Sequence, residues 1–347
     1  MKAIIAGVTG AVGGAIARAL ASSGGWVVAG LSRNPPRNTI AGVQYVPANL
    51  ADAGQCRQAL GRHGDATHLF YCARATHQEQ TLEDAATNLA LLDNVLSAAE
   101  GGPLRHVHLV QGGKVYGVHV GPFPTPARED DPRAVIENFN YDQEDLLRHR
   151  CEGRPWTWSA SRPNTLLHFS PDIARNLVSS LGAYAAVCRE LGCALDFPGP
   201  EGAYRSLTQV TSLDLLARAM AWMATEPRCA NQAFNVTNGD VFRWGRLWPR
   251  IAGAFDMPCG SVRPLRLAEV MQGKETVWDR VRERYGLAER PLSSVANWGY
   301  LDATLERTWD EILSTTKART FGFHDWEDSE ERLLALIGEY RAAKILP

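Results

Sequence analysis

Short runs of apolar and β-branched residues alternate with longer segments of helical periodicity through the first half of the chain. The strand-like runs are KAIIAGV, WVVAGLS, THLFYCA and HVHLVQG, and a further one, WTWSASRP, occupies 156–163. Helices are predicted between them at 11–23, near 52–62, at 78–99 and from about Tyr141 onward. Because strands and helices alternate one by one, the pattern predicts a parallel sheet with helices on both faces.

The second half of the chain has a mixed pattern. An amphipathic helix is expected from about 172 to 191 and another at 212–225, followed by the strand-like QAFNVTN and then by helices rich in Trp and Arg. We therefore predict an α/β protein. Residues 1–165 would form a Rossmann-type, doubly wound parallel sheet, with 232–240 returning to it, and residues 166–347 mainly a smaller, mostly helical substrate lobe.

Charge and cysteine usage narrow the class of partner. The 347 residues include 36 basic and 38 acidic side chains, a formal net charge of -2, which gives no field that would attract nucleic acid or an anionic membrane. The seven cysteines show no C-x-x-C pair and no histidines at metal-ligand spacing, so no metal is expected. A small-molecule partner is therefore predicted, and a homodimer is compatible with this composition.

The start of the chain bears on its location. It opens directly on a strand-like run and lacks an apolar stretch that ends in a small-residue cleavage site. No segment reaches the roughly 18 uninterrupted apolar residues that a membrane span requires. We expect a cytoplasmic protein.

A glycine pattern closes the first strand and opens the first helix. Gly7, Gly10 and Gly13 form G-x-x-G-x-x-G, which would permit a tight turn and bring backbone N–H groups to a pyrophosphate at the positive end of the helix. The alternative is a tight turn without a ligand. The strand-turn-helix context favours nucleotide binding.

The end of the second strand indicates which dinucleotide is bound. A site for NAD would usually place an acidic side chain there, whereas this chain has Ser32 and Arg33. A hydroxyl and a guanidinium suit a 2′-phosphate, so NADPH is the predicted cofactor, unless Arg33 is only a solvated surface side chain. The ends of the third and fourth strands, at Asn49 and Arg74, should face the same crevice, because ligands of open α/β sheets bind outside the carboxyl ends of the strands.

Two residues are candidates for acid chemistry. Lys114 follows the fifth strand, and Tyr141 begins the next helix, so both should lie over one crevice. A phenol can donate to an oxygen that becomes negative during reduction, and a nearby ammonium strengthens it as an acid. Asp145, one turn after Tyr141, and Glu144 are interpreted as carboxylates that favour the helix N-terminus. The alternative is a core tyrosine and a solvated lysine.

These segments together resemble the progesterone 5β-reductase / iridoid synthase-like family, atypical members of the extended short-chain dehydrogenase/reductases. The resemblance covers almost the whole chain, through GVTGAVG, LSRNP, THLFYCARA, VQGGKVYG, NFNYDQED, WTWSASRPNTLLHFSP and QAFNVTNGDVFRWGRLW. It implies NADPH-dependent reduction of activated C=C bonds in enones and enals. The lysine and tyrosine roles of the family carry to Lys114 and Tyr141, and Asn49, Arg74 and Asn140 depart from its usual residues.

The residues and the resemblance together predict the site. Tyr141 and Lys114 are the expected catalytic residues, and Tyr116, Phe123 and Phe169 are the expected substrate contacts. The expected cofactor contacts are Gly7, Thr9, Gly10, Ala11, Val12, Gly13, Ser32, Arg33, Asn34, Asn49, Leu50, Ala73, Arg74, Gln111, Gly112, Tyr141, Pro163, Leu166, Ile173 and Ala174.

Three functions are compatible with this site. The first is an NADPH-dependent ene-reductase for a small enone or enal, in which Tyr141 stabilises the enolate oxygen. The second is a carbonyl reductase or alcohol dehydrogenase, because the same donor serves direct carbonyl reduction. The third is a sensor that binds NADP without chemistry, since fold alone does not determine function.

Overall fold

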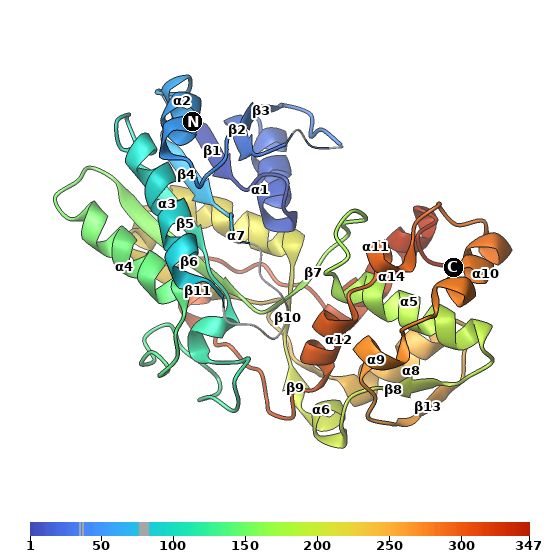
Figure 1. Ribbon diagram of the computed structural model, residues 1–347. Coiled ribbons are helices and arrows are strands. Elements are labelled where there is room, and N and C mark those ends of the chain that lie inside the picture. Colours follow the sequence, from blue (N-terminus) through green and yellow to red (C-terminus); the bar gives the residue numbers. More distant parts are fainter. Residues whose placement is uncertain (35, 37, 76–82) are drawn as a thin grey trace.

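The computed structural model describes residues 1–34, 36, 38–75 and 83–347. Within these residues a parallel sheet of seven strands, in the order β11-β6-β5-β4-β1-β2-β3, forms the centre of the first lobe (Figure 1). The sheet grows outward from β1 in both directions, so the predicted doubly wound Rossmann-type fold is confirmed. The strands are β1 (Lys2–Ala6), β2 (Val27–Ser32), β3 (Val43–Pro47), β4 (His68–Tyr71), β5 (His106–Val110), β6 (Thr157–Pro163) and β11 (Gln232–Val236).

Helices cover both faces of this sheet, because the inner strands bury side chains on both sides. On one face α1 (Ala11–Ser22) packs beside α7 (Leu213–Thr225). On the other, α2 (Ala53–Gly61), α3 (Ala85–Ala99) and α4 (Phe139–Cys151) lie side by side (Figure 1). Residues 78–82 of the predicted helix 78–99 lie outside the described residues.

The helix predicted from about 172 begins later than expected, since α5 spans Leu177–Glu190. The side chain of Asn176 accepts hydrogen bonds from the backbone nitrogens of Val178, at 2.9 Å, and Ser179, at 3.2 Å. An asparagine in this position satisfies N–H groups that the first helical turn leaves without partners. The apolar periodicity extended the prediction backward, and the cap decides where the helix starts.

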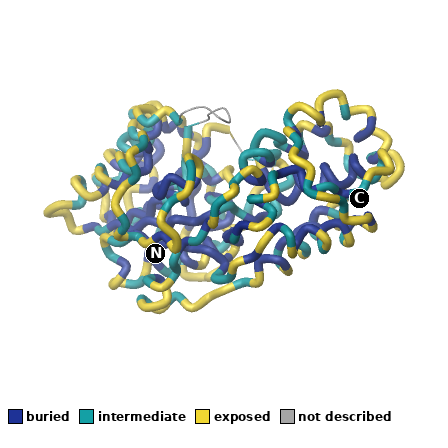
Figure 2. The backbone as a smooth tube through the Cα atoms, turned by 90° about the horizontal axis from the view of Figure 1, so that it is seen from below, coloured by how far each residue is buried: buried dark blue, intermediate teal, exposed yellow. Residues whose placement is uncertain are grey.

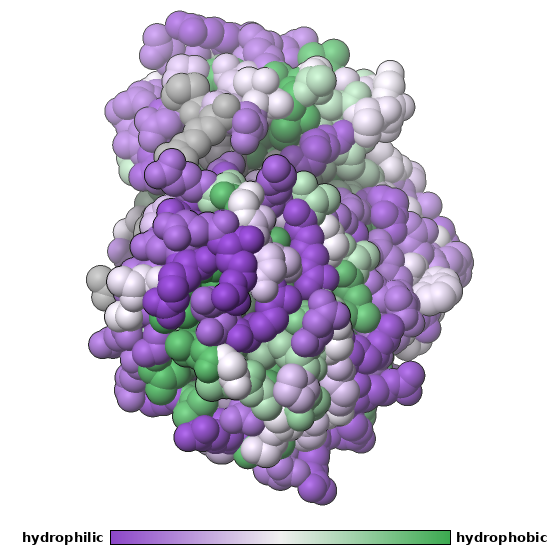
Figure 3. Space-filling model, turned by 90° about the vertical axis from the view of Figure 1, so that its right-hand side faces the viewer, coloured by the Kyte–Doolittle hydropathy of each residue, from purple (hydrophilic) through white to green (hydrophobic). Residues whose placement is uncertain are grey.

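The second lobe is mostly helical and has its own core, as predicted. Its helices α5, α8 (Trp244–Ala254), α10 (Glu275–Tyr285) and α14 (Ser329–Ala342) bury the indoles of Trp244, Trp248 and Trp278. Buried backbone runs through both lobes in Figure 2, and apolar patches are scattered among hydrophilic residues on the face that Figure 3 shows. The division of the chain at residue 165 stays a prediction.

The remaining elements connect and extend the two lobes. A parallel pair, β7 with β10, lies where the chain passes between them (Figure 1). These elements are β7 (Thr165–Leu167), β8 (Leu195–Phe197), β9 (Leu207–Thr208), β10 (Val210–Ser212), β12 (Phe242–Arg243), β13 (Cys259–Val262), α6 (Glu201–Arg205), α9 (Leu267–Val270), α11 (Leu292–Val295), α12 (Trp298–Leu305), α13 (Thr316–Thr320) and the short 3-10 helices η1 (Gly113–Tyr116) and η2 (Pro227–Cys229).

A row of polar side chains is buried on the central strands β5 and β6. His106 contacts the hydroxyls of Thr157, at 2.9 Å, and Ser159, at 2.8 Å. His108 contacts the hydroxyls of Ser159, at 2.8 Å, and Ser161, at 3.1 Å. Burial lowers the pKa of His106 to about 3 and moves the pKa of His108 well below its usual range. Both imidazoles are therefore neutral in the folded protein, with both ring nitrogens hydrogen-bonded.

Candidate active site

The glycine loop after β1 is shaped for close approach to a ligand. Gly7 has a φ of +82°, which favours glycine, and a Cβ there would lie 2.9 Å from the Cα of Ala73. A Cβ at Gly13 would overlap the carbonyl oxygen of Gly7. Gly10 is the N-cap of α1, and because it has no side chain, no side chain at this position caps the N–H groups of the first helical turn. The loop and the helix N-terminus thus form a backbone cradle of the kind that binds a pyrophosphate.

The substitution Gly13→Ala is expected to damage this cradle. The added methyl group must displace the backbone at Gly7, which should cost about 1–3 kcal/mol of free energy of unfolding and weaken NADPH binding about tenfold or more. Gly25→Ala is the control, because nothing lies within 4 Å of a Cβ at that position. Urea denaturation and NADPH fluorescence titration measure the two effects. Equal NADPH affinity in Gly13→Ala and wild type would contradict the assignment.

A cavity of about 700 Å³ opens beside the glycine loop. The first lobe contributes Gly10 and Arg33, and the second contributes Phe169, Ile173 and Arg332 from α14. The structure therefore brings together, around one cavity, residues that the sequence placed in a nucleotide site. The predicted residues among its lining are Thr9, Gly10, Ala11, Arg33, Asn34, Phe169 and Ile173.

Two exposed arginines line the cavity. Arg33 is the residue predicted from sequence, and Arg18, on α1, was missed. Arg18 lies one helical turn after Gly14, and its Nη1 would be 3.7 Å from a Cβ at Gly14. That spacing is the signal that could have found it. Within the described residues neither guanidinium forms an ion pair, so the two together suit a phosphate.

The other predicted contacts follow the carboxyl ends of the strands. Gly112 lies against the end of β6, since a Cβ there would be 3.5 Å from the carbonyl oxygen of Pro163. Ser32 donates to the carbonyl oxygen of Asn34 at 2.7 Å, which indicates a role in shaping the loop. At this edge of the sheet, β3 is followed by Asn49 and Leu50, β4 by Ala73 and Arg74, and β5 by Gln111 and Gly112, while β6 ends at Pro163.

Lys114 lies on η1, directly after β5. Its Nζ donates to Oε1 of Glu83 at 3.0 Å, and Nη2 of Arg74 contacts the same oxygen at 2.6 Å. Burial lowers the pKa of Lys114, and the charge of Glu83 opposes this shift. The ammonium is thus partly desolvated and held at the carboxyl edge of the sheet.

Tyr141 lies in the first turn of α4, whose N-cap is Asn138. The phenol donates to the carbonyl oxygen of Val115 and accepts from the backbone nitrogen of Ala134 at 3.1 Å. Burial raises the pKa of Tyr141, although the guanidinium of Arg133, 4.8 Å from the ring centroid, opposes this shift. The phenol therefore carries its proton at neutral pH. It contacts the same turn, η1, that carries Lys114, but the two side chains bind different partners, and their direct cooperation stays a prediction.

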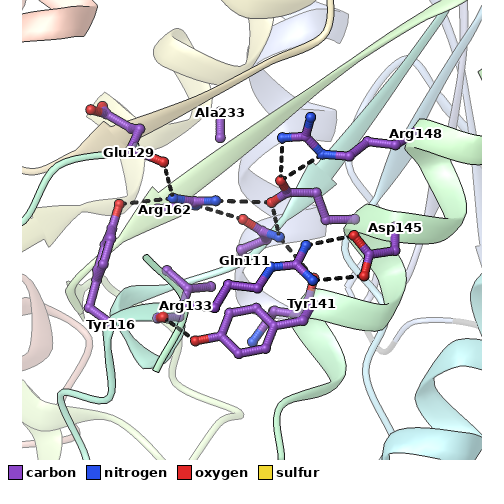
Figure 4. A network of polar contacts seen from close by, with 12 residues as sticks. Gln111, Tyr116, Glu129, Arg133, Tyr141, Asp145, Arg148, Arg162 and Ala233 are labelled. Carbon is purple, nitrogen blue, oxygen red and sulfur yellow. Dashed lines mark hydrogen bonds and ion pairs between the residues drawn. The ribbon is translucent and has the colours of Figure 1, made fainter. Parts of the chain in front are cut away.

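The carboxylates Asp145 and Glu144 of α4 do not act as favourable charges at the helix N-terminus, contrary to what the sequence had suggested. Asp145 forms a two-point ion pair with Arg133, at 2.6 and 2.7 Å (Figure 4). Glu144 is buried and accepts from Arg162 at 2.9 Å. The acidic residue of the first helical turn is Asp142 instead. The earlier interpretation was wrong because it considered the helix alone, whereas both carboxylates have partners on other segments.

Arg162 on β6 is the centre of a buried polar network (Figure 4). Its guanidinium donates to Oε1 of Gln111 at 2.9 Å, to the hydroxyl of Tyr116 at 3.0 Å and to Glu144. Tyr116 in turn donates to Oδ1 of Asn235 at 2.7 Å. Sequence reasoning did not identify Arg162. Because it ties β5, β6, β11 and α4 together, the network supports the elements that carry Lys114 and Tyr141.

Two further predicted residues, Phe123 and Leu166, pack in apolar clusters. Phe123 packs with Tyr141 against a small cluster that contains Val115 and Leu313. Leu166 packs against the core under α1 and α7. Ala174 precedes α5, and its carbonyl oxygen accepts from the backbone nitrogen of Asn176 at 2.8 Å. Phe123 and the candidate acid therefore pack against the same cluster, while Phe169 lines the cavity next to the glycine loop.

The described part of the chain offers neither a membrane-spanning helix nor a metal site. No helix in residues 1–34, 36, 38–75 and 83–347 has the length and apolar character needed to cross a bilayer. Within the same ranges, no three His, Cys, Asp or Glu side chains are grouped so that they could hold a metal ion.

Comparison with known proteins bears on the class of this fold and site. Residues 55–347 match the model of the PRISE-like Rossmann-fold domain. The chain is 35% identical over 365 aligned positions to (S)-8-oxocitronellyl enol synthase ISY2 of Nepeta racemosa, covering 99% of this chain and 91% of that protein. It is also 35% identical to 3-oxo-Delta(4,5)-steroid 5-beta-reductase of Arabidopsis thaliana, covering 99% and 93%. A short-chain dehydrogenase/reductase superfamily protein of Agrobacterium tumefaciens, solved with bound NAD, shares the fold at a TM-score of 0.69 and 15% identity, covering 99% and 97%.

The fold and the named relatives define a Rossmann-fold oxidoreductase. Within this class the chain belongs to the PRISE-like Rossmann-fold family. The resemblance to progesterone 5β-reductase and iridoid synthase predicted from the sequence is thereby confirmed, as is the prediction that the protein is an enzyme.

Proposed function

We propose that this protein uses NADPH to reduce the activated C=C bond of a small enone or enal. The observation that carries the proposal is the 35% identity, over 99% of the chain, to a relative named for a 3-oxo-Delta(4,5)-steroid, in which a C=C bond is conjugated to a ketone. A second relative, equally similar, is named as an enol synthase. Both names fit a reaction that passes negative charge to the oxygen of a conjugated carbonyl.

The residues of the first lobe fit NADPH. The cradle at Gly7, Gly10 and Gly13 would hold the pyrophosphate, and it needs glycine because a side chain at Gly7 or Gly13 would collide with the backbone of Ala73 or Gly7. Arg33 and Arg18 would hold the 2′-phosphate through charge-assisted hydrogen bonds. When bound, NADPH would supply the hydride that adds to the β-carbon of the substrate.

The role of Tyr141 is to hold a proton at its hydroxyl and offer it to the developing enolate oxygen. That proton is donated to the carbonyl oxygen of Val115 in this structure, so the substrate oxygen replaces one neutral acceptor. Lys114, on the same turn, supports the phenol with its positive charge. A donor that is partly shielded from water stabilises a developing anion more strongly than one in bulk water. The α-carbon takes its proton from solvent or a nearby acid.

The product decides between this reaction and reduction of the carbonyl, for which the same phenol could serve. Purified protein is incubated with NADPH and a conjugated ketone, and the products are separated by gas chromatography. A saturated ketone supports the proposal. An allylic alcohol identifies a carbonyl reductase, and NADPH binding without any product identifies a protein that only binds the cofactor.

The cofactor preference is expected to depend on Arg33. In Arg33→Ala, loss of a charge-assisted hydrogen bond should raise KM for NADPH about tenfold or more, while KM for NADH stays close to the wild-type value. NADH serves as the internal control, since it lacks the 2′-phosphate. Steady-state kinetics with both cofactors measure the effect. An equal rise for NADH and NADPH would show that Arg33 shapes the loop and does not bind the phosphate.

A further inference from the structure

A carboxylate of the chain itself is bound between two cations at the candidate active site. Oε1 of Glu83 is 2.6 Å from Nη2 of Arg74 and 3.0 Å from Nζ of Lys114. The Glu83 side chain is only 11% exposed, whereas those of Arg74 and Lys114 are about a third exposed, at 35% and 32%. The two cations therefore still face solvent on one side, while the oxygen that joins them is shielded.

The cations come from different elements that meet at the carboxyl edge of the sheet. Arg74 follows β4 and Lys114 follows β5, which are neighbours in the sheet. Arg175 precedes α5 in the second lobe, and its charge also acts on Lys114. Its guanidinium is 4.2 Å from the ring centroid of Tyr300, on α12. Positive groups from both lobes are thus gathered around Lys114.

This arrangement fits a bound carboxylate. Burial lowers the pKa of Lys114, the charge of Glu83 raises it, and Arg74 and Arg175 lower it further. Cations that repel one another in a partly desolvated place are stabilised by an anion, and a carboxylate oxygen accepts well from a guanidinium and an ammonium together. Glu83 shows that an oxygen can satisfy both donors at once.

We propose that the substrate is an enone that carries a carboxylate, and that Glu83 holds the place of this carboxylate until the substrate binds. One substrate oxygen would take the position of Oε1 between Arg74 and Lys114. An ammonium has three N–H donors, so Lys114 can bind this oxygen and still support Tyr141. This inference rests on the proposed function, and it adds the class of substrate.

Acetylacrylate and its methyl ester test the proposal as substrates. Addition of one hydride and one proton to the C=C bond of acetylacrylate gives levulinate, and the ester gives methyl levulinate. With wild-type protein, kcat/KM should be about tenfold or more higher for the acid, the effect of a hydrogen bond between charged groups. Because both substrates are compared in one protein, their ratio is independent of any change in cofactor binding.

Two substitutions should move this ratio in opposite directions. Arg74→Gln removes one cation and should bring the ratio close to one. Glu83→Gln removes the charge of the competing carboxylate and should raise the ratio above the wild-type value. Arg150→Gln is the matched control, because Arg150 also pairs with carboxylates, Asp93 and Glu100, but on the outer helices α3 and α4, and should leave the ratio unchanged.

Binding of the products separates this inference from the proposed function. Levulinate and methyl levulinate are titrated into the protein with NADP⁺ bound, by isothermal calorimetry. Levulinate binding at least about tenfold tighter than the ester, with the advantage lost in Arg74→Gln, supports the carboxylate site even if neither enone is reduced. Equal affinity for the two compounds overturns it, even if both enones are reduced. Thermal denaturation of each variant verifies that it is folded.

Discussion

Replacing Tyr141 by phenylalanine is expected to lower enone reduction about 10²–10³-fold, the effect of removing one oxyanion donor elsewhere. Phe keeps the ring that packs against the cluster with Val115 and under Arg133, and it removes only the hydroxyl. The loss should therefore fall mainly on kcat, with NADPH affinity close to the wild-type value. Steady-state kinetics and NADPH fluorescence titration separate the two quantities.

Lys114→Ala is the companion variant. It removes the charge that we assign to support the phenol, so kcat should again fall by orders of magnitude while NADPH still binds. Tyr285→Phe is the matched control, because Tyr285 also lies under a guanidinium, that of Arg189, 4.6 Å from the ring centroid. Wild-type kcat in both Tyr141→Phe and Lys114→Ala would remove these residues from the mechanism.

The second large effect is on stability in acid, and it arises from the buried histidines. Burial lowers the pKa of His68 to about 4 and of His106 to about 3, and it moves the pKa of His108 well below its usual range. The three side chains lie next to one another on β4 and β5. In the unfolded chain each would titrate with a pKa of about 6.5.

The direction of the effect follows from proton binding. Above pH of about 6.5 all three histidines are neutral in both states and contribute nothing to the pH dependence. Between pH of about 6.5 and about 4 the unfolded chain binds protons that the folded protein excludes, so the free energy of unfolding falls as the pH falls. Each histidine contributes about 1.4 kcal/mol per pH unit, and the three together about 4.

Urea denaturation at pH values from about 7 to about 4.5 measures this loss. His108→Gln keeps an amide beside Ser159 and Ser161 but cannot titrate, so it should reduce the slope by about 1.4 kcal/mol per pH unit. His149→Gln is the control, because His149 is exposed on α4. A free energy of unfolding that stays constant between pH of about 6.5 and about 5 would contradict the prediction.

The sequence pattern was sufficient to identify a site residue where its position depends on a single segment of the chain. The glycines after β1 were identified because their spacing describes one turn, and the structure places that turn at the cavity. Lys114 and Tyr141 were placed at a strand end and a helix start because those positions follow from the alternation of elements. Arg33 was found for the same reason, at the end of β2.

The sequence did not show which side chains pair when they come from segments far apart in the chain. Arg162 and Glu144 are 18 residues apart and meet only because β6 lies beside β5 under α4. Glu83 and Lys114, 31 residues apart, meet because they follow neighbouring strands. Arg18 was missed because a basic residue on an amphipathic helix is normally solvated, and only the packing of the second lobe makes it part of a cavity.

By itself the sequence determined the order of strands and helices, the glycine turn and the place of the candidate acid along the chain, because apolar periodicity and steric demands act within a few residues. Only the tertiary structure decided which charges meet. It paired both Lys114 and Arg74 with Glu83, turned the hydroxyl of Tyr141 to Val115, and buried Glu144 on Arg162. The physical reason is that an ion pair depends on distance in space, and strand register and lobe packing set that distance.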